Sequence, residues 1–324
     1  MGIIAVAGGT GGVGRALVEA IVARGKHDVK ILSRNASHAA KHSRLLKAND
    51  AAAVEIGVPI VVVDYGSFES LTNVFEENNF DTVISALSTM PQEGTPPEVN
   101  MIRAAQASKS TRRFIPSNWA LPIRGEIAKL LPSSGMKTQA LEALEKTDLE
   151  WTVFYAGFFT DFYATPAIKT YLNPMTAVID LEHNMAAIPG TGNTPVSFIH
   201  TFDLAKLVDR ALDFEKWDPE YYVVGDSLTW NDFARTVEAV RGTKLTIVYD
   251  SVEDLKQGKA TELPALTKAL PFIPIPREAM LSFIATFGLL FDGGVMNFNH
   301  KDTLNKKFPD IKTLSVKEAL EANV

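Results

Sequence analysis

The stretch Ile3-Ile-Ala-Val-Ala-Gly-Gly-Thr-Gly-Gly-Val-Gly-Arg15 decides the fold. A short apolar run from Ile3 to Ala7 leads at once into a glycine-rich turn, and a helical pattern follows over Val13 to Ala23. A strand, a tight glycine turn and a helix in this order open a βαβ unit. In that context glycines let the backbone approach a pyrophosphate at the helix N-terminus. We therefore expect a dinucleotide to bind at this turn.

The same alternation of strand and helix continues through the first half of the chain. Further apolar runs predict strands over Val29 to Leu32, Ile60 to Asp64, Thr82 to Ala86, Arg113 to Pro116 and Trp151 to Tyr155. Helical patterns lie between them over Ser67 to Asn78, Pro97 to Ser108 and Met136 to Glu145, with Ser67 as the expected N-cap. Continuously apolar strands are covered on both faces. The predicted fold class is α/β, a doubly wound parallel sheet of the Rossmann type.

This regularity ends after Gly157, where we expect a second region to begin. Residues 1–157 are predicted to form the nucleotide-binding domain, with returning segments near 196–225, and residues 158–324 a smaller, interleaved substrate lobe. The elements expected there are helices over Asp203 to Phe214, Asn231 to Arg241 and Ala279 to Phe291, the last one buried, and a returning strand over Tyr222 to Val224. The stretch from Pro264 to Pro276 lacks a helical period and is predicted to be a proline-rich connector.

The composition is that of an ordinary globular chain and argues against several classes of protein. The 324 residues are 46% hydrophobic, carry a net charge of -6 and include no cysteine. Without thiolates, and with scattered histidines, no metal site is expected. Dispersed lysines and arginines argue against a nucleic-acid partner, and no apolar stretch is long enough to predict a membrane span. The expected location is the cytoplasm, and a homodimer is left open.

The turn and the strand ends predict how a cofactor would bind. Strand two ends in Ser33-Arg34 rather than in the acidic residue that would bind a ribose 2′-hydroxyl. Arg34 can bind a 2′-phosphate through charge-assisted hydrogen bonds, which favours NADP(H). Asp64 is placed to accept a hydrogen bond from adenine. The cofactor set predicted from these positions is Gly8, Thr10, Gly11, Gly12, Val13, Gly14, Arg34, Asp64, Ser85 and Ala86.

Lys137 is the candidate catalytic residue. The Tyr-x-x-x-Lys pair of short-chain dehydrogenases is missing, because Ser133 stands four residues before Lys137. A lysine beside a nicotinamide in an apolar pocket has its charged form disfavoured, so Lys137 could exchange protons nearer neutral pH. It could instead stay charged and stabilise a developing oxyanion. Taken alone, Lys137 is more simply explained as an exposed helical lysine.

Several strings extend the case along the chain. They are the turn from Gly8 to Arg15, Arg34, Arg113-Phe-Ile-Pro-Ser117, the Lys137 helix ending in Ala143-Leu-Glu145, Trp151-Thr-Val-Phe-Tyr-Ala-Gly-Phe-Phe159, Val196-Ser-Phe-Ile-His-Thr-Phe-Asp-Leu-Ala205, Arg241-Gly-Thr-Lys244 and Phe308-Pro-Asp-Ile311. Together they resemble the NmrA-like and isoflavone-reductase-like branch of atypical short-chain reductases over nearly the whole chain. The resemblance implies NADPH as cofactor and Lys137 as the catalytic or ribose-positioning group. It adds Pro116, Ser117, Lys137, Gly157 and Phe158 to the cofactor set.

The substrate is less closely predicted. Plant members of that branch carry an acidic and aromatic turn after Pro-Ser, whereas this chain has Asn118-Trp-Ala120. The residues expected to form an apolar wall for a flat or hydrophobic ligand are Met90, Trp119, Phe158, Phe159, Phe162 and Tyr163, although core packing would explain each equally well. The expected activity is hydride transfer from NADPH to a C=C or C=O of a small aromatic or conjugated, phenylpropanoid- or polyketide-like metabolite. A non-catalytic NADP-sensing regulator and a non-redox cyclase or isomerase of secondary metabolism stay open.

Overall fold

A parallel sheet forms the centre of the computed structural model, which describes residues 2–34, 57–87, 95–131, 134–164, 166–173, 175–273 and 275–324. The sheet is six-stranded in the order β3-β2-β1-β4-β5-β6, and every neighbouring pair is parallel. The strands are β1 (Ile3–Ala7), β2 (Asp28–Arg34), β3 (Ile60–Val63), β4 (Thr82–Ser85), β5 (Arg113–Ile115) and β6 (Glu150–Trp151). This order confirms the predicted doubly wound α/β fold.

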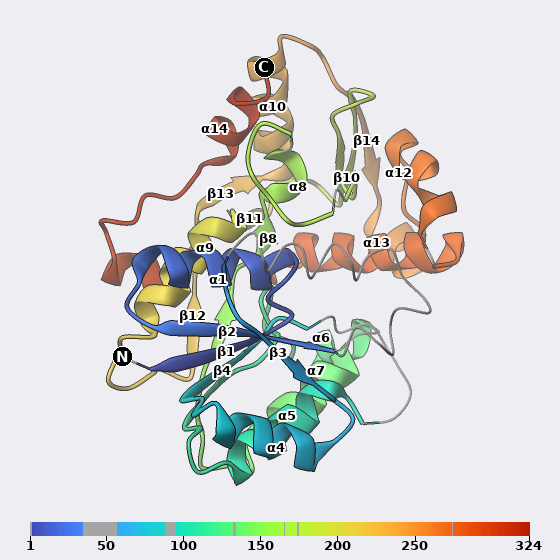
Figure 1. Ribbon diagram of the computed structural model, residues 1–324. Coiled ribbons are helices and arrows are strands. Elements are labelled where there is room, and N and C mark those ends of the chain that lie inside the picture. The colour runs from blue at the N-terminus through green and yellow to red at the C-terminus, as the bar shows by residue number, and fades with distance from the viewer. Residues whose placement is uncertain are drawn as a thin grey trace.

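Helices cover both faces of this sheet (Figure 1). On one face α1 (Gly12–Arg24) packs against α9 (Thr201–Ala211), and on the other lie α4 (Phe68–Glu77), α5 (Pro97–Ala107) and α7 (Ser134–Leu144). The apolar side chains Leu17, Val18 and Ile21 of α1 are fully buried, and each contributes about 1.5–3 kcal/mol by leaving water. The Ser67 hydroxyl caps α4 as predicted, accepting a hydrogen bond of 3.2 Å from the Ser70 amide.

The predicted sixth strand is divided in two. Its first part is β6, which pairs with β5, and its second part is β7 (Val153–Tyr155), which pairs in parallel with β12 (Glu220–Tyr222). Between them the Thr152 amide donates to the Phe114 carbonyl over 3.3 Å, at the point where pairing passes from β5 to β12. The returning strand expected near Tyr222 is therefore present, beginning two residues earlier than predicted.

The remaining elements build a second layered region in the upper half of Figure 1. One three-stranded sheet holds β8 (Phe158–Phe159), β11 (Pro195–Ile199) and β13 (Asp226–Thr229), and another holds β9 (Ile179–Asp180), β10 (Met185–Pro189) and β14 (Thr246–Asp250). The helices α8 (Asp161–Ala164), α10 (Trp230–Arg241), α11 (Val252–Lys256), α13 (Arg277–Asp292) and α14 (Val316–Glu321) complete it. Helix α6 (Glu126–Leu130) lies beside α7, and the 3-10 turn η2 (Leu304–Lys307) places Leu304 in the core that α1 and α9 share. Its core is aromatic, with Phe158, Phe198 and Trp230 in mutual edge contact.

Two expectations for the late part of the chain are wrong. The stretch from Pro264 to Pro276 is not a plain connector, since it forms helix α12 (Pro264–Ala269) and the 3-10 turn η1 (Leu270–Phe272). Proline is favourable at the first position of a helix, and the buried Leu266 gives α12 an apolar contact. Helix α13 is buried mainly toward its C-terminal end, around Leu290 and Phe291, rather than along its whole length. No helix within the described ranges is long and apolar enough to cross a membrane.

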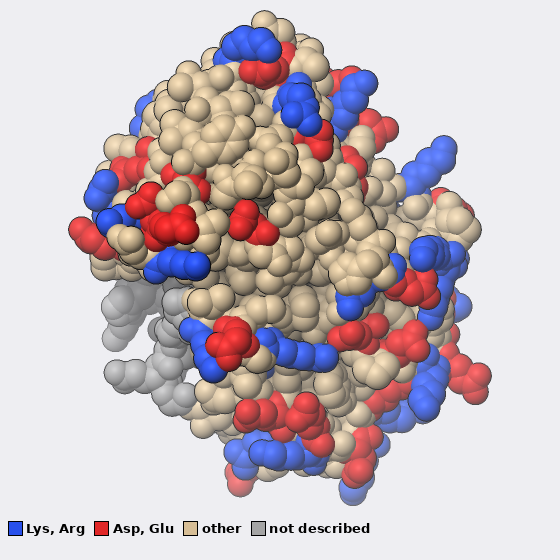
Figure 2. Space-filling view, turned by 180° about the vertical axis from the view of Figure 1, so that it is seen from behind, with Lys and Arg blue, Asp and Glu red and all other residues tan. Residues whose placement is uncertain are grey.

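The surface carries mixed charge. On the face shown in Figure 2, lysines and arginines alternate with acidic side chains over the lower half, and the upper half has a wide area without charge. A track of basic side chains that could follow a nucleic-acid backbone is not visible on this face.

Candidate functional site

The glycine-rich turn connects β1 to α1 and packs against the end of β4. A Cβ added at Gly8, whose φ is +76°, would lie 2.5 Å from the Ala86 carbonyl oxygen, and one added at Gly14 would lie 2.2 Å from the Gly8 carbonyl oxygen. Both positions therefore need glycine for close packing. At Gly11, the N-cap of α1, an added Cβ would meet no described atom within 4 Å.

The open side of Gly11 lies where a helix start offers hydrogen-bond donors. The first amides of a helix have no acceptor within the helix, and the helix dipole favours an anion there. Thr10 and Gly12 are partly exposed beside this space, while Val13 packs against the core below α1. The arrangement fits a phosphate group.

The ends of β2 and β3 carry the two residues predicted to bind the adenosine half of the cofactor. Arg34 ends β2, is exposed, and pairs in register with Val63 of β3. Asp64 follows β3, is also exposed, and its Oδ1 accepts a 2.9 Å hydrogen bond from the Gly66 amide. A guanidinium and a carboxylate are thus presented at neighbouring strand ends on the carboxyl edge of the sheet, where open α/β sheets bind ligands.

The ends of β4 and β5 are held together by two hydrogen bonds and leave polar atoms unused. The Ser117 hydroxyl donates to the Leu87 carbonyl over 2.8 Å, and Trp119 Nε1 donates to the Ser85 carbonyl over 3.1 Å. The buried Ser85 hydroxyl and both amide atoms of the buried Asn118 side chain have no hydrogen-bond partner within the described structure. Buried polar groups are normally paired. These atoms therefore have unused hydrogen-bonding capacity, and Pro116, which precedes Ser117 in the chain, is also buried.

Lys137 lies near the start of α7, on the same side of the sheet as α5. Its side chain is half-buried and makes no direct hydrogen bond or ion pair with any described residue. Burial lowers the pKa of Lys137, and the negative charge of Glu98 partly opposes this effect. Whether Lys137 exchanges a proton or stays charged to stabilise an oxyanion stays a prediction.

Glu98 is the group that sequence reasoning missed. It lies in the first turn of α5 and is 6% exposed, and its Oε1 accepts a 2.6 Å hydrogen bond from the Ser117 amide. The pKa of Glu98 is raised because burial outweighs the opposing effects of the Ser117 amide, the nearby Ser85 hydroxyl and the Lys137 charge. A glutamate in a first helical turn is common because it complements the helix dipole, so nothing in the sequence distinguishes Glu98 from a surface residue.

The predicted aromatic wall divides between core and surface. Trp119, Phe158 and Tyr163 are 6%, 3% and 2% exposed, and Trp119 stacks on Phe154 with 6.0 Å between ring centroids. Phe159 and Phe162 are half-buried and keep part of their surface accessible. Met90 lies outside the described residues.

Gly157 has a packing role in this structure. Its φ is +69°, and an added Cβ would lie 2.2 Å from the Ser197 carbonyl oxygen. The close approach brings the end of β7 against β11, one residue before the predicted cofactor residue Phe158.

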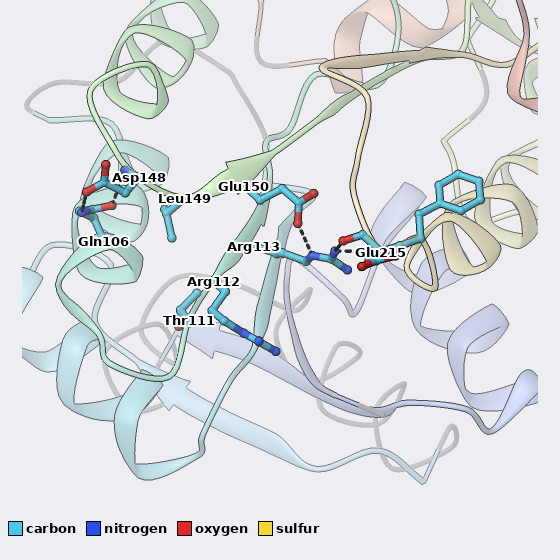
Figure 3. Close-up of a pocket in the computed structure, with 9 residues that line it drawn as sticks. Gln106, Thr111, Arg112, Arg113, Asp148, Leu149, Glu150 and Glu215 are labelled. Carbon is cyan, nitrogen blue, oxygen red and sulfur yellow. Dashed lines mark hydrogen bonds and ion pairs between the residues drawn. The ribbon is translucent and has the colours of Figure 1, made fainter.

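A separate cavity of about 620 Å³ lies at the opposite edge of the sheet, where β5 and β6 begin (Figure 3). Arg113, in its wall, donates to Glu150 over 2.6 Å and to the carbonyls of Phe214 and Glu215 over 2.9 and 2.7 Å. Its donors are used in holding the chain after α9 to the sheet. We assign this cavity to packing rather than to ligand binding.

Comparison with known proteins agrees with this architecture. The description "NmrA-like family" applies to residues 2–287. The chain is 30% identical to "Oxidoreductase BOA1" of Botryotinia fuckeliana, with 95% of each chain covered, and 30% identical to "Oxidoreductase swnN" of Metarhizium robertsii, with 88% of this chain and 89% of that protein covered. Among solved structures, "AtPrR2 with NADP+ and (+)pinoresinol" superposes with a TM-score of 0.77 at 19% identity, covering 100% of this chain and 99% of that one. The chain therefore belongs to the NmrA-like family.

Proposed function

We propose that this chain is an NADPH-dependent reductase of a small aromatic or conjugated metabolite, of phenylpropanoid- or polyketide-like type. The observation that carries the proposal is one edge of the sheet. Gly11 lies at the start of α1, after the carboxyl end of β1, and has open space beside it. Lys137 lies near the start of α7, after the carboxyl end of β5, and is half-buried and unpaired. A turn that fits a phosphate and a lysine without a partner in the described structure, both at the carboxyl edge of the sheet, provide what a nicotinamide reductase needs.

The cofactor would lie across the carboxyl ends of the strands. The first amides of α1 would hold the pyrophosphate, Arg34 the 2′-phosphate, and Asp64 the adenine. The unpaired Ser85 hydroxyl and Asn118 amide have the chemistry to accept the carboxamide and ribose of the nicotinamide half. Bound NADPH supplies a hydride. The first relatives are named as oxidoreductases, and the solved structure cited above contains NADP+, which supports this assignment.

The substrate would lie between the two regions of the chain. We assign residues 1–157, with the returning segments near 196–225, to cofactor binding and residues 158–324 mainly to substrate binding. Phe159 and Phe162 offer partly exposed aromatic surface for a flat, hydrophobic ligand. Trp119 and Tyr163 are buried, so they would not contact the ligand directly but would pack beneath this surface and fix its shape.

In this proposal Lys137 neutralises or stabilises the negative charge that forms on the substrate. Hydride addition to the carbon of a C=O, or to one end of a conjugated C=C, leaves a negative charge on oxygen or on the conjugated system. The Lys137 ammonium donates the proton that neutralises this charge, or it stabilises the charge until water supplies a proton. Water returns the proton to Lys137 after product leaves. Glu98, buried behind the ends of β4 and β5, favours the charged form of Lys137 in this step.

A binding and turnover experiment tests the proposal. Calorimetry should detect NADP+ binding, and a panel of aromatic enones, quinones and aryl aldehydes should reveal consumption of NADPH by its absorbance. Arg34→Ala should weaken NADPH binding much more than NADH binding. Lys137→Met should abolish turnover while leaving NADPH affinity mostly intact, and Lys146→Met, which changes an exposed lysine just beyond α7, should not. Binding without consumption of NADPH across the panel would point to an NADP-sensing protein instead.

A further inference from the structure

The segment 166–173 reaches across from the second region of the chain to the phosphate-binding turn. A Cβ added at Gly12 would lie 3.5 Å from Leu172 Cδ2, so the Leu172 side chain borders the first residue of α1. One residue earlier, the Tyr171 ring lies 4.0 Å below the Arg15 guanidinium in a cation–π contact. Two consecutive side chains of this segment therefore contact the start of the helix that carries the phosphate site.

Glu19 of α1 holds the segment in place. Its carboxylate accepts hydrogen bonds from Lys169 Nζ over 2.6 Å, from Arg15 Nε over 3.3 Å and from the Tyr171 hydroxyl. Partial burial would raise the pKa of Glu19, but hydrogen bonds from Lys169, Tyr171 and Arg15 outweigh it and lower that pKa. The carboxylate is therefore charged at neutral pH and links the segment to the second turn of α1.

A second anchor is buried on the other side of the segment. Asp161, 1% exposed, accepts hydrogen bonds from the Thr170 hydroxyl over 2.6 Å and from the Thr201 amide over 2.8 Å. The Thr170 hydroxyl in turn accepts the Leu172 amide over 3.1 Å. His200 lies against the same carboxylate, with Nε2 3.4 Å from Asp161 Oδ1. Asp161 thus connects the segment to α8 and to the start of α9.

We propose that residues 166–173 form a strap that builds the outer wall of the nucleotide site, and that Leu172 and its anchor Thr170 slow the release of NADP(H). This inference rests on the proposed function, because it needs a nucleotide at the turn. An apolar side chain beside the turn keeps water away from the phosphate, which strengthens the hydrogen bonds between phosphate and helix amides. Release then requires the strap to move, so its effect falls mainly on the dissociation rate.

The test measures NADP+ dissociation from the full-length protein by stopped-flow displacement. Leu172→Ala, which removes the apolar cover, should raise the dissociation rate about tenfold with little change in the association rate. Thr170→Val keeps the side-chain shape but loses the hydrogen bond to Asp161, and should raise the dissociation rate by a smaller factor. The matched control Val22→Ala shortens an exposed side chain elsewhere on α1 and should leave the rate unchanged.

Trypsin cleavage gives a second readout. Bound NADP+ should slow trypsin cleavage after Lys169, which is 60% exposed in the strap. If Thr170→Val fails to fold, Leu172→Ala and the cleavage assay still test whether the strap slows the release of NADP(H). Wild-type binding of NADP+ combined with an unchanged dissociation rate in Leu172→Ala would overturn the strap alone. No binding of NADP+ by the wild-type protein would overturn the cofactor assignment and the strap together.

Discussion

Replacing Gly11 with alanine separates phosphate binding from folding. The added Cβ has no described atom within 4 Å, and the backbone φ of −151° suits any residue. Losing glycine at an N-cap costs roughly 0.5–1 kcal/mol, while the smaller chain entropy of alanine in the unfolded state contributes about 0.4–1 kcal/mol in the opposite direction. The two effects nearly cancel. The free energy of unfolding without ligand should therefore change by no more than about 0.5 kcal/mol.

The same methyl group should weaken nucleotide binding. It would occupy the space through which a pyrophosphate approaches the amides of Gly12 and Val13. Losing one hydrogen bond to a charged group costs about 1.5–3 kcal/mol, so the Kd for NADP+ should rise at least about tenfold. Isothermal titration calorimetry measures this change directly. A Gly11→Ala protein that binds NADP+ with the wild-type Kd would refute the placement of the phosphate at this turn.

Gly14→Ala is the contrasting variant, three residues further along the chain. Its Cβ would lie 2.2 Å from the Gly8 carbonyl oxygen, a backbone atom that cannot rotate away. Overpacking of this kind costs about 1–3 kcal/mol or more, which exceeds the gain of about 1 kcal/mol for alanine over glycine within a helix. Urea unfolding without ligand should show a clear loss of stability for Gly14→Ala. Equal stability of the two variants would contradict the close packing of β1 and α1 around the turn.

Two further substitutions test electrostatic contacts. Glu98→Gln keeps an acceptor for the Ser117 amide but removes the charge, so the pKa of Lys137 should fall and the alkaline limb of the kcat/KM profile should move to lower pH. An unmoved limb would show that Glu98 does not control the charge of Lys137. Asp213 is partly buried, which raises its pKa, but hydrogen bonds from basic side chains of residues 24–27 outweigh this and lower the pKa well below its ordinary value. That stabilisation is fully present above about pH 4 and declines progressively on acidification, so Asp213→Asn should cost about 1 kcal/mol at pH 7 and less near pH 2 in urea unfolding.

The fold and the close-packed glycine-rich turn could be predicted because their causes are local. The cap of α4 needs only the Ser67 hydroxyl, which accepts a hydrogen bond from the amide of Ser70, three residues later. At the turn, Gly8 and Gly14 leave room for backbone atoms, and a strand before the turn and a helix after it give the pattern its meaning. The division of strand six at Thr152 was not predictable in this way, because it depends on where β12 returns from a distant part of the chain.

The aromatic wall shows a second limit. Phe158 and Phe159 are adjacent in β8, so their side chains point to opposite sides, and each packs against a different core cluster. Both are phenylalanines, and the neighbouring residues in the sequence do not indicate which of the two side chains is accessible to a ligand. Tyr163 enters the same aromatic core as Phe158, with 6.4 Å between ring centroids. Composition could identify an aromatic stretch but not its accessible members.

The availability of polar groups, rather than the size of a cavity, favours the candidate site over the cavity in Figure 3. The cavity in Figure 3 is lined by two arginines, of which Arg112 forms an ion pair with Asp81. Arg113 already donates to a carboxylate and to three backbone carbonyls, including that of Leu212. A ligand there would have to displace bonds that hold the fold together. Within the described part of the chain, Lys137 and the Ser85 hydroxyl have no such direct partner, although both are at least partly buried. Unpaired buried groups are unfavourable in the absence of a ligand, and a molecule bound at this sheet edge would pair with these groups.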